Sequence, residues 1–295
     1  MRIGLIDVDG KNFPNIPLMK LSAWHKAQGD VVEWYHPFTD RFDRVYLSKV
    51  FTFTPDYDLC LNADEVVRGG TGYSVASLPL PDDVEYIYPD YGLYGITDTA
   101  YGFLTRGCPR GCDFCIVGEK EGRRSHKVAN LDEFWRGQKN IVLCDPNILA
   151  CPDWADLLGQ LAASKAKVDF NQGLDARLLT EDKIDALNRI RISEIHFAWD
   201  RYKDGEAILP KLDLYARLGR VKPNGHKAIV YVLCNFDTTI AQDLDRIYTL
   251  RDMGYWAYVM LFDKKNASQE HLSLQRWCNN RFIFAKCERF EDYNQ

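Results

Sequence analysis

Segments of strand length alternate with helical patterns along most of this chain of 295 residues. This alternation restricts the fold more than any other feature, because it is typical of α/β proteins built on a mainly parallel sheet. In the second part of the chain, the six candidate strands are residues 100–106, 140–144, 167–171, 193–199, 228–234 and 257–262. Six βα units are too few for a closed eight-stranded barrel. We therefore expect a partial (β/α)6 barrel over residues 100–267 and a C-terminal helix within residues 268–295.

Residues 1–80 carry the same alternation on a smaller scale. An apolar strand at RIGLIDV precedes a helical pattern over IPLMKLSAWHKAQG, and short strands are expected at VVEWY, DRVYLS and YDLCLN. This order predicts a small Rossmann-like, doubly wound domain over residues 1–80. Residues 81–99 are rich in Pro and Tyr and form the expected connector between the two domains.

The overall charge is slightly negative, since 37 basic residues stand against 42 acidic ones. Such a balance gives no general attraction to nucleic-acid phosphates or to anionic lipid. The start MRIGLIDVDG lacks the charged and apolar regions of a signal peptide, and no run of about 18 apolar residues occurs. We expect a cytoplasmic protein without a membrane segment; the charge does not support a nucleic-acid partner, although it does not exclude one. Nine cysteines without the spacing of a disulfide scaffold favour reduced thiols and metal ligation.

Three cysteines, Cys108, Cys112 and Cys115, directly follow the first expected barrel strand at the spacing Cys-x3-Cys-x2-Cys. In barrels of βα units, the loops after the strands build the active site. A structural zinc ion would take four ligands. Three thiolates on a four-iron cluster would instead leave one iron open to an exogenous ligand. A zinc loop and three buried thiols are the alternatives.

This loop, with the aromatic residue Phe114 immediately before the third cysteine, resembles the radical S-adenosylmethionine superfamily. The resemblance implies that Cys108, Cys112 and Cys115 bind a 4Fe-4S cluster and that Phe114 lies in the cofactor site. It also implies that S-adenosylmethionine binds the open iron and is cleaved reductively to a 5′-deoxyadenosyl radical, which takes hydrogen from an unknown substrate. An electron donor such as flavodoxin or ferredoxin is then needed. A non-catalytic iron–sulfur sensor or scaffold is the alternative from another class.

The other contacts to S-adenosylmethionine are expected at the ends of later strands. Family members often carry a Gly-Gly-Glu turn after the second strand, whereas this chain has CDPN, which makes Asp145 and Asn147 the candidate acceptors. A turn that only ends the strand is the alternative. After the next strand, Gln172, Asp175 and Arg177 are candidates, because an Arg suits a carboxylate and an Asp suits a ribose hydroxyl. Each of these could equally be a solvated loop residue.

The strand SEIHFAWD has a face of small and polar residues, which includes His196 and Asp200, opposite a face of large apolar residues. We expect the polar face to line the barrel interior, so His196 and Asp200 are the catalytic candidates and Asp200 is also a candidate cofactor ligand. The alternative for His196 is a structural histidine with satisfied hydrogen bonds. Arg123 and Arg124 follow the cysteine loop and could contact the cofactor or an anionic substrate, although a solvated loop explains them as well.

A small domain ahead of the barrel resembles the class of this superfamily that has an N-terminal cobalamin-binding domain. Here the domain is abbreviated and lacks an Asp-x-His-x-x-Gly loop. We therefore expect a cap or substrate-recognition element that does not bind cobalamin; a cobalamin-dependent radical methyltransferase is the alternative. The polar residues Asp7, Asp9 and Asn12 and the GGTGY segment at 69–73 could bind a cation, hydroxyls or a phosphate, but ordinary turns explain them as simply.

Three further cysteines, Cys144, Cys151 and Cys234, lie at or near expected strand ends. They could hold a second cluster or donate hydrogen to a product radical. Cysteine is also a common buried residue. We expect buried thiols here and one cluster per chain.

Overall fold

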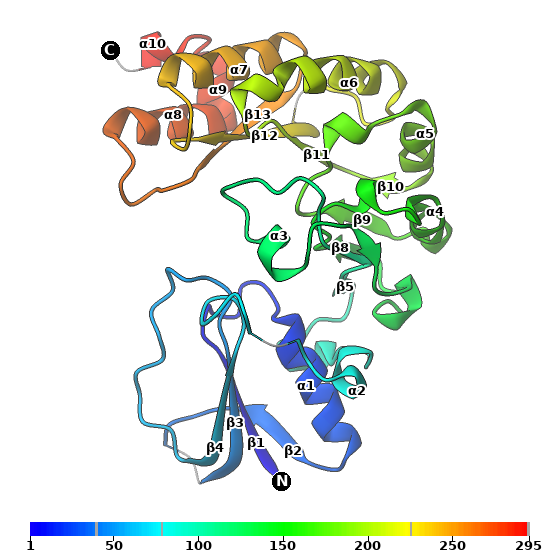
Figure 1. The fold of residues 1–295 in the computed structure, drawn as a ribbon, viewed down its shortest axis with the longest axis vertical. Helices are drawn as coiled ribbons and strands as arrows, with labels where there is room; N and C mark the ends of the chain where they lie inside the picture. Colours follow the sequence, from blue (N-terminus) through cyan, green and yellow to red (C-terminus); the bar gives the residue numbers. More distant parts are fainter. Residues whose placement is uncertain (39–40, 78, 225, 294–295) are drawn as a thin grey trace. The chain divides into compact units, whose positions relative to one another are not determined.

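The structure is a computed structural model that describes residues 1–38, 41–77, 79–224 and 226–293 (Figure 1). The chain is an α/β protein with parallel sheets, as the alternation of strands and helices predicts. It divides into two compact units. The first unit contains residues 1–102, 119–121 and 129–141, and the second contains residues 103–118, 122–128 and 142 onward. The expected connector, residues 81–99, therefore packs with the first unit.

The first unit is built on a four-stranded parallel sheet with the order β2-β1-β3-β4. Its strands are β1 (Arg2–Asp7), β2 (Val31–Trp34), β3 (Phe42–Ser48) and β4 (Ala63–Gly69). Helix α1 (Ile16–Ala27) connects β1 to β2, and it begins at Asn15, whose side chain accepts a hydrogen bond from Leu18 N. The later elements of this unit are α2 (Asp82–Glu85), η1 (Tyr91–Tyr94), β5 (Thr99–Gly102) and η2 (Leu131–Glu133).

The two faces of this sheet are covered differently. On one face, Ile3 of β1 packs against Leu18 of α1. On the opposite face, Ile6 of β1 belongs to an apolar cluster against which the loop residue Tyr57 packs. Residues 49–62 are all described and form no helix. The second helical layer that a doubly wound sheet would carry is therefore not found in this segment.

The fourth strand lies at a different place from the one expected. The prediction of a strand at YDLCLN was wrong, because residues 57–62 are irregular and β4 consists of ADEVVRG. Strand β4 is at the edge of the sheet and pairs with β3. Edge strands carry charged side chains that discourage pairing with other chains. The charges of ADEVVRG therefore hide this strand from a search for apolar alternation.

The cysteine loop of the second unit has a short β-ribbon at its base. Strand β6 (Thr105–Arg106) pairs antiparallel with β7 (His126–Lys127), and α3 (Val117–Lys120) lies between them in the sequence. The expected strand over residues 100–106 is thus divided into β5 and β6. Because β6 and β7 are hydrogen-bonded, both ends of the cysteine loop are held together.

Five parallel strands in the remaining chain confirm the strands expected between residues 140 and 262: β8 (Asn140–Leu143), β9 (Lys167–Phe170), β11 (Ile195–Ala198), β12 (Ala228–Cys234) and β13 (Trp256–Leu261). A short strand, β10 (Arg191–Ile192), pairs with β9 and was not expected. Strands β8, β9 and β10 belong to one sheet, and β11, β12 and β13 form another. One isolated bridge joins Leu174 to Phe197 between the sheets. Among the described residues, the strands form separate sheets and no barrel is shown.

Helices and short 3₁₀ turns connect these strands, as βα units require. The helices are α4 (Trp154–Ser164), α5 (Glu181–Arg189), α6 (Gly205–Leu218) and α7 (Ile240–Asp252), and the turns are η3 (Ile148–Ala150), η4 (Ala176–Leu178) and η5 (Tyr202–Asp204). Helix α7 begins with a capping box formed by Thr239 and Gln242. No helix in the described ranges is long and apolar enough to cross a membrane.

The expected alternation of SEIHFAWD is confirmed. Ile195 and Phe197 are fully buried. The Phe197 ring packs on Tyr215 of α6 with a centroid distance of 4.9 Å. Figure 1 shows α6 and α7 beside the sheet β11-β12-β13. His196 and Ala198 are half-buried on the other face. This second face is therefore the one that can receive a ligand.

The C-terminal region contains more than the single helix expected there. It forms α8 (Gln269–Asn279), α9 (Arg281–Lys286) and α10 (Phe290–Tyr293). Asn280 interrupts the helical pattern, because its side-chain oxygen accepts hydrogen bonds from Phe282 N and Ile283 N and so begins α9.

Candidate functional site

The three cysteines of the motif lie on the loop between β6 and β7. Cys108 N donates to Gly122 O at 3.1 Å, and Cys115 N donates to Cys112 O at 3.0 Å, which forms a tight turn. Cys108 and Cys112 are half-buried, whereas Cys115 is exposed. In the part of the chain that the structure describes, no three His, Cys, Asp or Glu side chains are already arranged around a metal position.

The thiols nevertheless share one electrostatic environment. Burial raises the pKa of Cys112, the charge of Asp200 raises it further, and the guanidinium of Arg177 lowers it. The charges of the other two motif thiols also raise the pKa of Cys112. A bound cation would favour the thiolate forms here.

Asn147, which follows β8, contacts the cysteine loop directly. Its Nδ2 lies 3.5 Å from Cys108 Sγ and 3.3 Å from Asp175 Oδ2. Its Oδ1 is buried and has no hydrogen-bond partner among the described residues. A buried amide oxygen without a partner is costly, so this atom is suited to accept a hydrogen bond from a ligand.

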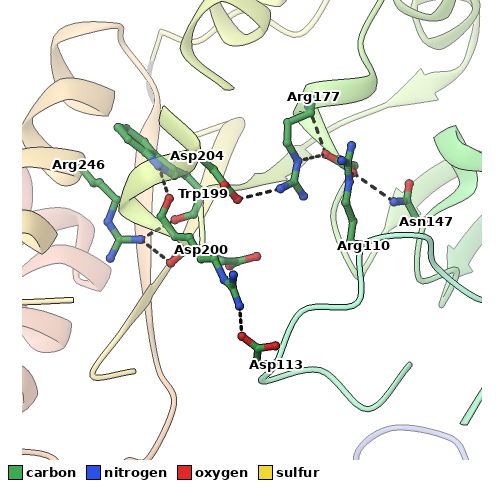
Figure 2. A network of polar contacts seen from close by, with 10 residues as sticks. Arg110, Asp113, Asn147, Arg177, Trp199, Asp200, Asp204 and Arg246 are labelled. Carbon is green, nitrogen blue, oxygen red and sulfur yellow. Dashed lines mark hydrogen bonds and ion pairs between the residues drawn. The ribbon is translucent and has the colours of Figure 1, made fainter. Parts of the chain in front are cut away.

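Asp175 is the centre of an ion-pair network at the ends of β8, β9 and β11 (Figure 2). Arg110 of the cysteine loop donates to Asp175 Oδ2 at 2.5 Å, and Arg177 Nε donates to Oδ1 at 2.8 Å. Arg177 Nη1 also donates to Asp204 at 2.9 Å. Burial alone would raise the pKa of Asp175, but the hydrogen bonds and charges of Arg177 and Arg110 hold it below its usual value.

Asp200 directly follows Trp199 at the end of β11, and its charge acts on Cys112. Burial raises the pKa of Asp200 to about 6, although Arg177 and Arg246 oppose the shift. The side chain is thus a carboxyl group that can exchange a proton near neutral pH. Arg201, the next residue, forms an ion pair with Asp113 of the cysteine loop (Figure 2).

Arg246 is a residue of this site that the sequence analysis missed. It is fully buried, and its Nη1 donates to the carbonyl oxygens of Trp199 at 2.7 Å and Asp200 at 2.9 Å. Its Nη2 donates to Leu233 O and to Asp243, both within 2.7 Å. Arg246 therefore holds the chain at the ends of β11 and β12. The signal was available, because Arg246 occupies the apolar face of α7, one residue before the buried Ile247.

The carboxylate of Asp145 makes its hydrogen bonds with other residues of the chain. Its carboxylate accepts hydrogen bonds from Leu104 N at 3.1 Å, Thr105 N at 2.5 Å and Thr105 Oγ1 at 2.6 Å. Burial raises the pKa of Asp145 to about 6, and these hydrogen bonds partly oppose the shift. Asp145 thus fixes the start of β6 and, through it, the base of the cysteine loop; a direct contact to a cofactor stays a prediction.

The aromatic residue of the motif packs within the second unit. Phe114 meets Phe236 edge to face at a centroid distance of 5.5 Å, and Phe236 meets Phe262 at 4.8 Å. Of the two expected arginines, Arg123 lies against Gly111, where an added Cβ would come within 2.9 Å of its guanidinium. Gly111 also has a positive φ of 59°, so both its backbone and its surroundings favour glycine. Arg124 is exposed.

Gln172 and His196 belong to another place in the second unit. Both line a cavity of about 380 Å³, which is also lined by residues of β12 and β13 and lies on the face of β11 opposite the buried Phe197. The sequence-predicted residues thus fall into two groups. Asn147, Asp175, Arg177 and Asp200 gather near the cysteine loop, whereas Gln172 and His196 line the cavity.

The polar segments of the first unit are explained by its own structure. Asp7 accepts a hydrogen bond from Tyr94 Oη at 2.7 Å. Asp9 accepts hydrogen bonds from Val50 N at 2.5 Å and Thr54 Oγ1 at 2.6 Å, while Asn12 is exposed. In the GGTGY segment, a Cβ on Gly70 would lie 2.2 Å from Lys49 O, so close backbone packing requires this glycine.

The three further cysteines near strand ends are buried. Burial raises the pKa of Cys144 to about 12 and also raises the pKa values of Cys151 and Cys234. Thiols in such surroundings are poor metal ligands and poor nucleophiles. Their burial favours a packing role, and the presence of one cluster per chain stays a prediction.

No protein-family model matches this chain, and no curated protein matches it either. Any functional assignment therefore depends on the residues and geometry of the site itself.

Proposed function

We propose that this chain is a radical S-adenosylmethionine enzyme in which Cys108, Cys112 and Cys115 hold a 4Fe-4S cluster. The observation that carries the proposal is the Cys-x3-Cys-x2-Cys loop, held at its base by β6 and β7 and contacted by polar residues at three strand ends. When bound, the cluster would supply the electron that cleaves S-adenosylmethionine into methionine and a 5′-deoxyadenosyl radical.

The order of the strands supports a partial barrel of the kind that this proposal requires. Strands β8, β9, β11, β12 and β13 follow one another in sequence, and Leu174 N donates to His196 O at 2.7 Å where the two sheets meet. In such an arrangement, the C-terminal ends of the strands face the same side. That is the side on which the cysteine loop and the Asp175 network lie.

The residues around the loop fit the cofactor groups that they would bind. The guanidinium of Arg177 has five N–H donors, so its ion pairs with Asp175 and Asp204 leave donors for the methionine carboxylate. The unpartnered Oδ1 of Asn147 suits the methionine amino group. We further assign to Asp200 a hydrogen bond from the amino group or a ribose hydroxyl, because its buried carboxyl group has a raised pKa and its charge acts on Cys112.

The test is anaerobic reconstitution of the full chain with iron and sulfide, followed by incubation with S-adenosylmethionine and dithionite. Dithionite replaces a protein donor such as flavodoxin or ferredoxin. We expect 5′-deoxyadenosine, detected by mass spectrometry, in an amount that depends on protein, cluster and reductant. A protein that assembles the cluster but gives no 5′-deoxyadenosine would instead support an iron–sulfur sensor. A protein that takes up zinc and no iron would refute both.

A further inference from the structure

The cavity of the second unit is separate from the cysteine loop in its lining. It measures about 380 Å³, which is within the usual range for small-molecule sites. Its wall contains the rings of His196, Tyr231 and Tyr258, the thioether of Met260, and the side-chain amides of Asn171 and Gln172. No Lys or Arg is among the described residues that line it.

The aromatic rings of this wall form a continuous surface. His196 stacks on Tyr231 with an interplanar angle of 8° and a centroid distance of 5.3 Å. Tyr231 in turn meets Tyr258 edge to face at 5.9 Å. Tyr258 and Met260 are 41% and 47% exposed, so a large apolar surface is uncovered. Tyrosine rings and a thioether bind flat aromatic groups well.

A polar pair with unused hydrogen-bonding capacity lies at the edge of the cavity: His196 lines it, and Asp169, which is outside the lining, faces His196. His196 Nδ1 and Asp169 Oδ1 lie 3.7 Å apart, too far for a hydrogen bond. Both atoms are buried, and neither has a hydrogen-bond partner in the described chain. The Asp169 side chain is 47% exposed, so its carboxylate can accept a hydrogen bond from a charged group of a ligand that extends past His196, which a purely apolar ligand would not supply.

Two carboxylates, Asp169 and Glu194, and one cation, Lys167, act on this side of the cavity. Burial raises the pKa of Asp169 and Glu194 raises it further, while His196 and Lys167 lower it. Burial and the charges of Asp169 and Glu194 also raise the pKa of Tyr231 to about 12. A negative field of this kind attracts cationic ligands and repels anionic ones.

We propose that this cavity binds a flat aromatic ring that carries a positively charged amino group, with the ring against Tyr231 and Tyr258 and the amino group at Asp169. The inference rests on the proposed function only where it makes this aromatic amine the substrate of the radical reaction. Binding itself requires neither the cluster nor S-adenosylmethionine.

Two ligands with the same ring and opposite charge test the proposal: tryptamine, an ammonium ion, and indole-3-acetate, a carboxylate. Their affinities for the full chain are measured by calorimetry, with and without the reconstituted cluster. We expect tryptamine to bind at least about tenfold more tightly than indole-3-acetate, because the amino group gains both the carboxylate of Asp169 and the aromatic faces. Equal affinities, or binding of neither ligand at millimolar concentration, would overturn the proposal.

Variants show whether the binding occurs in this cavity. Tyr258→Ala should weaken tryptamine binding about fivefold or more, since it removes an aromatic face. Asp169→Asn should reduce the preference for tryptamine over indole-3-acetate to about threefold or less, because the charge is lost. The control Phe282→Ala removes an aromatic ring that is 75% exposed elsewhere, and Asp185→Asn removes a surface carboxylate that pairs with Arg189.

Both controls should bind tryptamine like the wild type. Circular dichroism shows whether each variant is folded, and Tyr258 is exposed enough that its loss should not unfold the protein. Tryptamine binding that survives both Tyr258→Ala and Asp169→Asn would place the site elsewhere and refute the inference. If tryptamine binds as expected but no 5′-deoxyadenosine is formed, the cavity assignment stands and the proposed function fails.

Discussion

Single side chains at the ends of strands decide how the cysteine loop is held. The carboxylate of Asp145 accepts hydrogen bonds from two backbone N–H groups at the start of β6. The side-chain amide of Asn147 contacts the thiol of Cys108, and Arg110 forms an ion pair with Asp175. Charge-assisted hydrogen bonds of this kind are stronger than neutral ones, especially when they are buried. The position of the loop therefore depends on a few polar residues as well as on apolar packing.

Replacement of any motif cysteine by Ala should greatly reduce iron binding. We expect about four irons per chain in the reconstituted wild type, a marked loss of iron in Cys108→Ala, Cys112→Ala and Cys115→Ala, and no 5′-deoxyadenosine from these variants. Cys60→Ala is the matched control, because Cys60 is an exposed thiol of the first unit. Iron content near the wild-type value in all three variants would rule out the assigned ligands.

Asp145→Asn should change the pH dependence of stability. Burial raises the pKa of Asp145 from 3.8 to about 6 on folding, so the folded state holds this proton more tightly than the unfolded state. The stabilisation of the folded state by this raised pKa is complete below the unfolded-state pKa of 3.8. It is lost as the pH rises through the folded-state pKa of about 6. Between about pH 4 and about pH 7, the wild type should lose up to about 3 kcal/mol more unfolding free energy than the variant.

Urea denaturation of both proteins at the two pH values measures this difference. The surface variant Asp185→Asn controls for the loss of a carboxylate. An identical pH dependence in the wild type and in Asp145→Asn would show that the carboxyl group of Asp145 does not titrate differently in the two states.

At the scale of secondary-structure elements, a buried ion pair connects helix α7 to the ends of two strands. Arg246 and Asp243 on α7 are both fully buried, and Arg246 donates hydrogen bonds to carbonyl oxygens at the ends of β11 and β12. Helix α7 therefore does more than cover the sheet, because Arg246 satisfies carbonyl oxygens at the C-terminal ends of two strands. The position of Asp200 follows from this contact, since its own carbonyl oxygen is one of the acceptors.

Arg246→Met should destabilise the protein by about 3–5 kcal/mol, since it leaves Asp243 buried without its partner. Arg217→Met is the control, because Arg217 forms an exposed ion pair with Asp213 on α6, and such pairs contribute at most about 1 kcal/mol. Unfolding in urea measures both effects. If Arg246→Met were as stable as Arg217→Met, the buried pair would have no anchoring role.

Elements with a clear apolar period could be predicted from the sequence, and elements defined by charge could not. SEIHFAWD shows its two faces because Phe197 is apolar and His196 is not, and the strand occurs where expected. ADEVVRG was missed because an edge strand is stabilised by one neighbour and needs few apolar residues. Arg246 was missed although it lies with Asp243, Ile247 and Leu250 on the buried face of α7, because its carbonyl acceptors lie on other elements.

At the scale of the whole molecule, the chain divides into two compact units. The sequence predicts a small first domain over residues 1–80 and a larger second one from residue 100, whereas the compact units of the structure have different bounds. Which residues pack with which unit could not be predicted, since residues 129–141 return to the first unit after the cysteine loop. Such a return depends on tertiary contacts that no local pattern records.

The first unit should not bind cobalamin. It lacks the histidine loop that commonly ligates the metal, and loop side chains such as Tyr57 pack against one face of its sheet. Anaerobic incubation with hydroxocobalamin, followed by gel filtration and visible absorbance, should show no co-eluting corrinoid. Stoichiometric co-elution at micromolar protein would instead indicate a cobalamin-dependent radical methyltransferase.

The ribbon formed by β6 and β7 bears on how the protein would acquire and lose the proposed cluster. Because Thr105 and Arg106 are already paired with Lys127 and His126, the ends of the cysteine loop need not be brought together when iron arrives. Many small metal domains are unfolded without their ion, since metal binding supplies their folding energy. Here the loop is anchored by protein contacts alone. Damage by oxygen would then empty the loop and leave a folded chain, which a cell could repair by reloading iron and sulfide.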